Sequence, residues 1–234
     1  MISFIVPAYN EARLLGATLA ALRVAADKQA EAYELIVVDD ASDDDTAAIA
    51  TAAGARVVSV HRRQIAATRN AGARAALGRW FVFVDADTLV SGEVVSATLD
   101  ALRAGAVGGG AGAAFDGAVP WYSRWVLPAL VALFRVARLA AGCYLYCTRE
   151  AFEAVGGFDE RYFGAEELVL SRALKTQGRF RVLRAQVATS GRKLRQYSSR
   201  EMLATLARLA WRGRRALQRR EGLDIWYGPR RNDP

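Results

Sequence analysis

Two aspartates at the end of an apolar run are the residues of this chain whose type and spacing best suit chemistry. Asp85 and Asp87 follow Trp80–Val84, which is wholly apolar and therefore predicts a strand buried on both faces. In open α/β sheets, ligands bind beyond the carboxyl ends of the strands. Two carboxylates at such an end suit Mg²⁺ or Mn²⁺, which keep waters and complete their shells with substrate phosphates. The residues alone also allow a strand-end turn with solvated acids.

The elements that would position these acids alternate between strand and helix. The expected strands cover residues 3–7, 34–40, 56–60 and 80–85, and the expected helices cover 15–26, 46–53, 65–77 and 93–104. This βαβ alternation predicts an α/β fold, with a mostly parallel, twisted sheet flanked by helices, as in a nucleotide-binding half-domain.

Two stretches after residue 104 leave alternatives open. Gly105–Ala114 is nearly all glycine and alanine, so it is either a loop or a strand that another backbone or a ligand approaches closely. Trp121–Ala141 is apolar and aromatic, but its longest uncharged run, 125–134, is far shorter than the roughly 20 residues of a spanning helix. It is interpreted as a core helix, or else as an acceptor-site or membrane-contacting segment.

Charge is distributed unevenly along the chain. Residues 1–171 contain 15 Lys/Arg and 20 Asp/Glu, whereas residues 172–234 contain 17 and 4. This basic end is either a solvated surface or the contact for a polyanion, which would be anionic lipid, nucleic acid or a phosphorylated substrate. The first residues lack the charged and long apolar regions of a signal peptide, and no segment predicts a transmembrane helix. We therefore expect a cytoplasmic protein.

Further polar clusters fall at the ends of the first two strands and in the helix before Asp85. They are Pro7-Ala8-Tyr9-Asn10-Glu11, Asp39-Asp40-Ala41-Ser42-Asp43-Asp44-Asp45-Thr46 and Arg69-Asn70-Ala71-Gly72. Together with Asp85-Ala86-Asp87, and followed by Gly156-Gly157-Phe158-Asp159-Glu160 and Gly164-Ala165-Glu166-Glu167, they resemble the family 2 glycosyltransferases of GT-A fold. The resemblance covers about residues 2–190.

The resemblance implies a nucleotide-sugar donor linked to UDP or GDP, and it assigns the donor contacts residue by residue. Those to the base and ribose are expected from Pro7, Ala8, Tyr9, Glu11 and Asp40, with Asp39 orienting the loop and with Asp85 and Ala86 near the ribose or the waters of the metal. Arg69 offers a planar donor fork for a base carbonyl or a diphosphate oxygen, unless it is a helix-surface arginine. The acidic run Asp43–Asp45 is expected to stabilise a helix N-terminus.

The resemblance also implies the chemistry, which is inverting transfer of the sugar to an acceptor hydroxyl. Asp87 is expected to contact Mg²⁺ or Mn²⁺ most directly, assisted by Asp85. Glu167, or else Glu166, would take the proton from the acceptor. The chain departs from the family in having no histidine after His61 for the metal, so Ser190, Arg192 or Lys193 is expected to contact the diphosphate instead. The donor sugar and the acceptor stay open.

The expected organisation is one GT-A domain over residues 1–197, with a nucleotide-binding half (1–104) and an acceptor half (105–197), followed by a basic amphipathic segment (198–234). Apolar residues and arginines on neighbouring helical faces favour contact of 198–220 with an anionic membrane, near a lipid-linked or membrane-borne acceptor, or else packing on the domain. A sugar nucleotidyltransferase lacks support because the first strand is followed by no Gly-rich basic loop. A nucleic-acid-binding protein would explain the basic tail but not the acids and Arg69 expected at the strand ends, and the tail lacks the pattern of aromatic stacking residues usual in single-strand binding.

Overall fold

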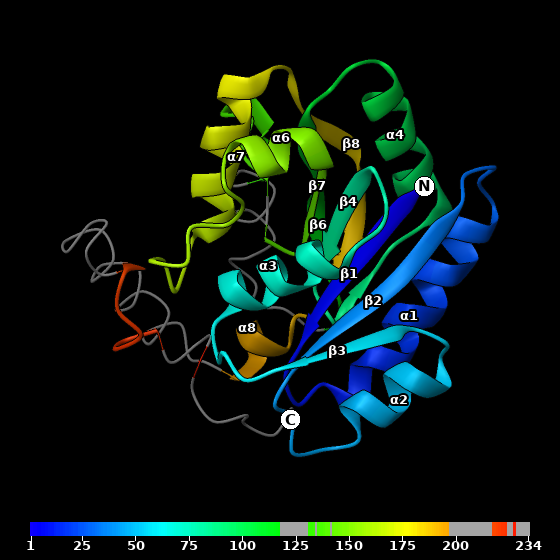
Figure 1. Ribbon diagram of the computed structural model, residues 1–234, viewed down its shortest axis with the longest axis vertical. Coiled ribbons are helices and arrows are strands. Elements are labelled where there is room, and N and C mark those ends of the chain that lie inside the picture. The colour runs from blue at the N-terminus through cyan, green and yellow to red at the C-terminus, as the bar shows by residue number, and fades with distance from the viewer. Residues whose placement is uncertain (118–130, 134, 141, 197–216, 224–226, 228–234) are drawn as a thin grey trace.

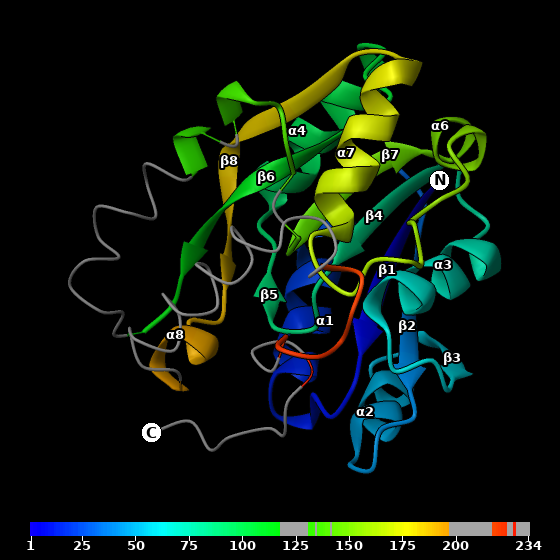
Figure 2. The ribbon, with the colours of Figure 1, turned by 90° about the vertical axis from the view of Figure 1, so that its left-hand side faces the viewer.

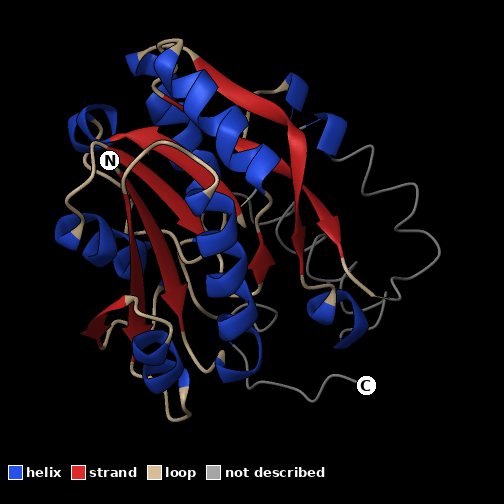
Figure 3. Ribbon diagram, turned by 90° about the vertical axis from the view of Figure 1, so that its right-hand side faces the viewer, coloured by secondary structure: helices blue, strands red, loops and turns tan. Residues whose placement is uncertain are grey.

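The computed structural model describes residues 1–117, 131–133, 135–140, 142–196, 217–223 and 227 (Figure 1). These residues contain an eight-stranded sheet with the strand order β3-β2-β1-β4-β7-β6-β8-β5. Helices lie on both faces of this twisted sheet (Figure 3). The predicted fold class, an α/β protein with a mostly parallel sheet between helices, is confirmed.

The first half of the sheet is parallel. Its strands are β1 (Ile2–Ala8), β2 (Tyr33–Asp40), β3 (Arg56–Val60) and β4 (Trp80–Val84). The helices that connect them are α1 (Ala12–Asp27), α2 (Thr46–Ala52) and α3 (Ile65–Ala75). The predicted alternation is confirmed, although the helix expected over 65–77 ends at Ala75.

The second half of the sheet reverses direction at β7 (Tyr144–Thr148), which is antiparallel to β4. β6 (Gly108–Phe115) is antiparallel to β7 and parallel to β8 (Phe180–Thr189), and β5 (Thr88–Leu89) pairs with the end of β8. The remaining helices are α4 (Gly92–Arg103), α6 (Arg149–Ala154), α7 (Glu166–Gln177) and α8 (Arg192–Gln196). The two expected halves of the domain therefore share one sheet.

Two apolar cores lie on opposite faces of the sheet because successive strand residues point to opposite sides. Phe4 and Val6 of β1 pack in a core with Leu19 of α1, whereas Ile5 packs in the other core with Phe83 and Phe158. This double burial explains why the parallel strands are continuously hydrophobic in sequence.

The Gly/Ala stretch after residue 104 forms strand β6, because its neighbours leave no room for side chains. The hydroxyl of Tyr146 donates a hydrogen bond across Gly109 to the carbonyl oxygen of Arg181 (2.6 Å). A Cβ atom added to Gly109 would overlap both of these partners. Of the two alternatives, the strand with a closely approaching backbone is therefore the one observed.

Two of the predicted segments lie largely outside the described residues. Of 121–141, residues 131–133 and 135–136 are helical, and 118–130, 134 and 141 are not described. Of 198–234, only 217–223 and 227 are described, so the amphipathic helix expected before them is untested. Within the described part of the chain, no helix is long and apolar enough to cross a membrane.

The described residues of the tail pack against the domain. The amide of Phe163 donates to the carbonyl oxygen of Leu217 (2.7 Å), and Leu223 is buried beside Gly164. The amide of Ile65 donates to the Tyr227 hydroxyl (3.4 Å). This part of the tail therefore lies against the loop that precedes α7 and against the start of α3.

The close approach at β6 predicts that Gly109→Ala destabilises the protein by about 1–3 kcal/mol, since the extra carbon displaces Tyr146 or the β8 backbone. Chemical denaturation measures this difference. Gly16→Ala in α1 is the matched control, because its Cβ would meet only Ile49 at an ordinary 3.7 Å, and it should stabilise the protein by about 0.5–1 kcal/mol. Equal effects at the two positions would contradict the packing described for β6.

Candidate active site

The predicted site residues gather where the parallel strands end. Loops after β1, β2 and β4 meet there with the start of α7 and the loop between β8 and α8 (Figure 2). Two networks of charged side chains lie at this edge. One is centred on Arg69 and the other on Arg192.

Arg69 connects both halves of the domain through its guanidinium. From α3, its Nη1 donates to Glu166 Oε1 (2.7 Å), and its Nη2 donates to Asp85 Oδ1 (2.8 Å) and to the carbonyl oxygen of Gly142 (2.9 Å). The side chain is 3% exposed, which rules out a helix-surface arginine. Its predicted contact with the nucleotide remains a prediction, and its observed partners are the two carboxylates.

Glu166 and Glu167 open α7 side by side but differ in their partners. Burial raises the pKa of Glu166, while the positive charge of Arg69 opposes that shift and binds the carboxylate. Burial, together with the negative charge of Glu166, raises the pKa of Glu167 to about 8. The Glu167 carboxyl lies beside Gly142, where an added Cβ would be 3.4 Å from its Cδ atom. Glu166 is thus committed to an ion pair, whereas Glu167 has the pKa of a neutral-pH base.

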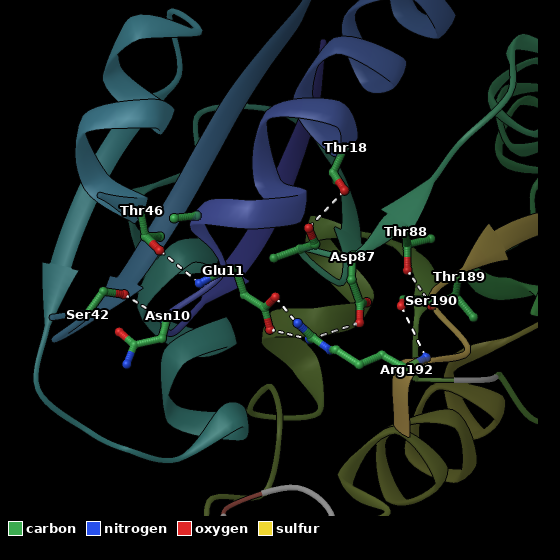
Figure 4. A network of polar contacts seen from close by, with 12 residues as sticks. Asn10, Glu11, Thr18, Ser42, Thr46, Asp87, Thr88, Thr189, Ser190 and Arg192 are labelled. Atoms are coloured by element: carbon green, nitrogen blue, oxygen red, sulfur yellow. Dashed lines mark hydrogen bonds and ion pairs between the residues drawn. The ribbon is translucent and has the colours of Figure 1, made fainter. Parts of the chain in front are cut away.

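Arg192 joins the loops of three strands (Figure 4). Its Nη2 donates to both carboxylate oxygens of Glu11 (3.0 and 3.1 Å) and lies 3.6 Å from Asp87 Oδ2. All three side chains are largely buried. The guanidinium therefore places a permanent positive charge beside Asp87, at the point where a donor diphosphate is expected.

Main-chain contacts fix this arrangement, since β5 pairs with the end of β8 and the Ser190 amide donates to the Asp87 carbonyl (3.1 Å). The Arg192 amide donates to Ser190 Oγ (3.2 Å), and the Gly191 amide donates to Asp116 Oδ1 (2.7 Å). Ser190 and Arg192 thus lie beside Asp87. The side chain of Lys193 is outside the description.

The two carboxylates at the end of β2 differ in their contacts. Asp40 accepts hydrogen bonds from the Arg62 and Gln64 amides (2.6 and 3.2 Å) and from the Thr68 hydroxyl (2.8 Å), which holds the start of α3. Asp39 Oδ1 is buried and accepts no hydrogen bond from the described residues. The orienting role expected for Asp39 stays a prediction, and of the two carboxylates Asp40 is the one whose observed hydrogen bonds hold a loop.

The residues after β1 form the neighbouring wall of the site. Pro7 and Ala8 are buried at the end of the strand, and the Tyr9 ring lies under Arg63, whose Cζ is 3.4 Å from the ring centroid. In the acidic run, Asp44 accepts from the Ala12 and Thr46 amides (3.1 and 3.0 Å), so it connects the starts of α1 and α2.

Three supporting residues were not identified from the sequence. Thr18 donates to the carbonyl oxygen of Ala86 (2.8 Å) and so holds the Asp85-Ala86-Asp87 loop against α1. Its signal was a polar residue on the apolar stripe of that helix. The carbonyl oxygen of Gly142 holds Arg69, and the carboxylate of Asp116 holds the β8–α8 loop. Of these two residues, only Asp116 could have been found from the sequence, as an acid at a strand end.

The donor set for a metal consists of Asp85 and Asp87. Among the residues that the structure describes, no group of three or more His, Cys, Asp or Glu side chains could hold a metal ion. Mg²⁺ and its relatives need only one or two protein carboxylates when phosphates complete the shell. The two aspartates fit that requirement together with a bound diphosphate, and they do not form a metal cage by themselves.

The chain belongs to a family of transferases. Residues 3–155 match the model of the family described as glycosyl transferase family 2, which is more than half of the chain, so the chain is a member of that family. Two curated relatives are undecaprenyl-phosphate 4-deoxy-4-formamido-L-arabinose transferases, from Sodalis glossinidius (strain morsitans) and Shewanella sediminis (strain HAW-EB3), 34% and 36% identical over 90 residues. These matches cover 38% of this chain and 27% of each relative, so the chain spans only about a quarter of their length.

Solved structures share the fold. The mannosyltransferase PcManGT of Pyrobaculum calidifontis, in complex with GDP-Man and Mn²⁺, has a TM-score of 0.68 and 24% identity, covering 92% of this chain and 60% of that one. Glucosyl-3-phosphoglycerate synthase of Mycobacterium tuberculosis, with Mn²⁺, UDP and phosphoglyceric acid, has a TM-score of 0.62 and 20% identity, covering 99% and 80%. S. aureus TarS with UDP-GlcNAc has a TM-score of 0.64 and 19% identity, covering 81% and 58%. The fold is therefore of GT-A type, as predicted.

Removal of the Arg69 guanidinium should destabilise the protein strongly. Arg69→Ala leaves Glu166 buried without its cation, and breaking a buried ion pair in this way costs about 3–5 kcal/mol. Arg74→Ala, at an exposed position of the same helix, is the control and should change stability by less than about 0.5 kcal/mol. Urea denaturation of both variants measures the difference, and a change at Arg69 as small as that at Arg74 would contradict a structural ion pair.

Proposed function

We propose that the chain transfers a sugar from a UDP- or GDP-linked donor to an acceptor hydroxyl, with inversion at the anomeric carbon. The observation that carries this proposal is the pairing of two carboxylate sites at one sheet edge. In this proposal Asp85 and Asp87 are on the donor side and Glu167 is on the acceptor side, and Arg69 binds both Asp85 and Glu166, the neighbour of Glu167. Family membership supports transfer over nucleotidyl transfer or nucleic-acid binding. The nucleotide sugars in the complexes of PcManGT and TarS support the donor class.

In the proposed reaction, Glu167 accepts the proton of the acceptor hydroxyl. The acceptor oxygen forms a bond to the anomeric carbon on the face opposite the diphosphate, while the bond from that carbon to the diphosphate oxygen breaks. The nucleoside diphosphate leaves with the electron pair, and the product is inverted. General-base assistance of this kind is typically worth about 10²–10⁴-fold in rate.

The departing diphosphate carries negative charge that the donor side must stabilise. Asp87 and Asp85 would hold Mg²⁺ or Mn²⁺, which supplies charge neutralisation to the leaving group when bound. Arg192 lies 3.6 Å from Asp87 and supplies a cation of its own, with Ser190 and Lys193 as further candidate contacts. Pro7, Ala8, Tyr9 and Glu11 form the proposed wall for the nucleoside.

The acceptor is proposed to be a hydroxyl on a lipid-linked or membrane-borne molecule. The curated relatives are named for undecaprenyl phosphate, which supports a lipid acceptor. A phosphate acceptor would be ionised near neutral pH and would need no base. The raised pKa of Glu167 therefore favours a hydroxyl. We further propose a cytoplasmic protein that is peripheral at the inner membrane face.

Metal-dependent donor binding should be lost in Asp87→Ala. Titration calorimetry should show that Mn²⁺ raises the affinity of the wild type for UDP and does not change the affinity of the variant, because Asp87 is the proposed main carboxylate ligand. Asp43→Ala removes an exposed acid from a neighbouring loop and should respond to Mn²⁺ like the wild type. If Mn²⁺ strengthens UDP binding equally in Asp87→Ala, the metal role of Asp87 is wrong.

The proposed base should be needed for transfer and not for donor binding. Glu167→Gln is expected to lower kcat by about 10²–10⁴-fold with UDP affinity unchanged. The wild-type rate should rise with pH and level off above about 8, since Glu167 accepts a proton only in its ionised form. Glu166→Gln is the matched control, and it should lower the pH of that rise because it removes the neighbouring negative charge.

Two outcomes would overturn this assignment. Wild-type turnover in Glu167→Gln together with loss in Glu166→Gln would make Glu166 the base. Wild-type turnover in both variants would favour an acceptor that is already ionised, such as a lipid phosphate.

A further inference from the structure

Two acid-free stretches of the sequence come together in the acceptor half. Residues 117–149 and 168–200 contain no aspartate or glutamate. In the described part of these stretches, a set of basic residues lies on one turn and on the end of α7 and the first half of β8. They are Arg135, Arg138, Arg172, Lys175 and Arg184.

Hydrogen bonds fix the turn of residues 131–133 and 135–138 beside β8 and α7. Arg135 Nη2 donates to the carbonyl oxygens of Leu183 and Arg184 (3.4 Å each), and Lys175 Nζ donates to that of Ala137 (2.8 Å). The turn, green in Figure 2, thus lies beside the part of β8 that β5 does not reach. A register shift of β8 against β6 at this point frees the carbonyl oxygens that Arg135 binds.

The surface that results combines exposed cations with exposed apolar side chains. Leu133 is 60% and Val136 is 83% exposed, and all the basic residues of the set except Lys175 are exposed. Burial lowers the pKa of Lys175 and the charges of Arg172 and Arg138 lower it further, so these three cations lie close to one another. The two apolar side chains are thus exposed beside a cluster of cations.

We propose that this basic face, formed by residues 131–133 and 135–138 together with Arg172, Lys175 and Arg184, docks on an anionic lipid bilayer. Arginine head groups pair with lipid phosphates while Leu133 and Val136 enter the interface, which is the pattern of interfacial membrane contacts. A nucleic acid is a poorer fit, because the one aromatic residue of 131–138 and 172–184 whose side chain is described, Phe180, is buried and offers no stacking surface.

Docking by this face has a geometric consequence for the proposed transfer. Glu167 lies in the first turn of α7 and Lys175 in its last turn, about 12 Å along the helix axis. A bilayer at the basic face would therefore lie close to the proposed base. The inference deepens the proposed function, since it places a membrane-borne acceptor, but vesicle binding does not depend on sugar transfer and can be tested separately.

The test is co-sedimentation of the full chain with vesicles of phosphatidylcholine alone or of equal parts phosphatidylcholine and phosphatidylglycerol. The wild type should bind only the anionic vesicles and release with salt. The combined variant Arg138→Glu, Arg172→Glu and Arg184→Glu should bind at least about tenfold more weakly. Leu133→Ser with Val136→Ser should also weaken binding, since the apolar contacts are lost.

Matched controls separate this face from net charge and from the tail. Arg13→Glu, Arg74→Glu and Arg103→Glu change the net charge equally at exposed positions of α1, α3 and α4, and they should keep wild-type vesicle binding. A tail variant, Arg208→Glu with Arg212→Glu and Arg215→Glu, should keep most of the binding to anionic vesicles. The circular dichroism spectrum, which reports folding without reference to nucleotide binding, should be unchanged in every variant.

The proposal is overturned if the wild type stays in the supernatant, if the Arg13, Arg74 and Arg103 variant loses as much binding as the face variant, or if only the tail variant loses binding. If the wild type binds a labelled DNA duplex but no vesicles, and the face variant loses affinity for that duplex, the face is assigned to nucleic acid instead. Sugar transfer to a soluble acceptor would survive any of these results, so the two proposals fail independently.

Discussion

The arrangement of the site depends on one buried guanidinium. Arg69 is 3% exposed, and it holds Glu166 and Asp85 at hydrogen-bond distance on its two terminal nitrogens. A buried cation of this kind is tolerated only when carboxylates and carbonyl oxygens pair with it. The requirement runs in both directions, because Glu166 is also buried and needs the cation. The acceptor helix α7 and the strand end at Asp85 are therefore held in fixed positions relative to each other.

The second network is also an arginine shared between two carboxylates, but here both carboxylates come from the same half of the domain. Arg192 is shared between Glu11 and Asp87, and both carboxylates come from the nucleotide-binding half. The pairing of β5 with β8 brings the arginine there, from a position far along the chain. The proposed donor side thus contains a permanent cation from the acceptor half, and Arg192 is one of the three residues expected there because no histidine follows His61.

The proposed transfer places carboxylates with different functions close together at one sheet edge. In that proposal Glu167 is the base, while Asp85 and Asp87 face the diphosphate. Arg69 pairs with Asp85 and Glu166, whereas burial and the negative charge of Glu166 raise the pKa of Glu167 to about 8 against the opposing charge of Arg69. The basic face at the far end of α7 then offers a surface for the membrane that would present the acceptor.

The sequence by itself determined the βαβ order, the strand ends and the family, because buried parallel strands are apolar throughout and the polar strings follow them directly. It could not decide between Glu166 and Glu167, nor show that Arg69 is buried. It did not identify the loop-holding hydrogen bonds of Asp40 or the supporting contacts of Thr18 and Gly142. Those facts depend on partners far away in the chain, such as Arg69 with Glu166, and local pattern carries no information about them. The tertiary structure alone shows that Arg69 is buried and that Glu166 pairs with it, since burial and pairing exist only after the two halves close into one sheet.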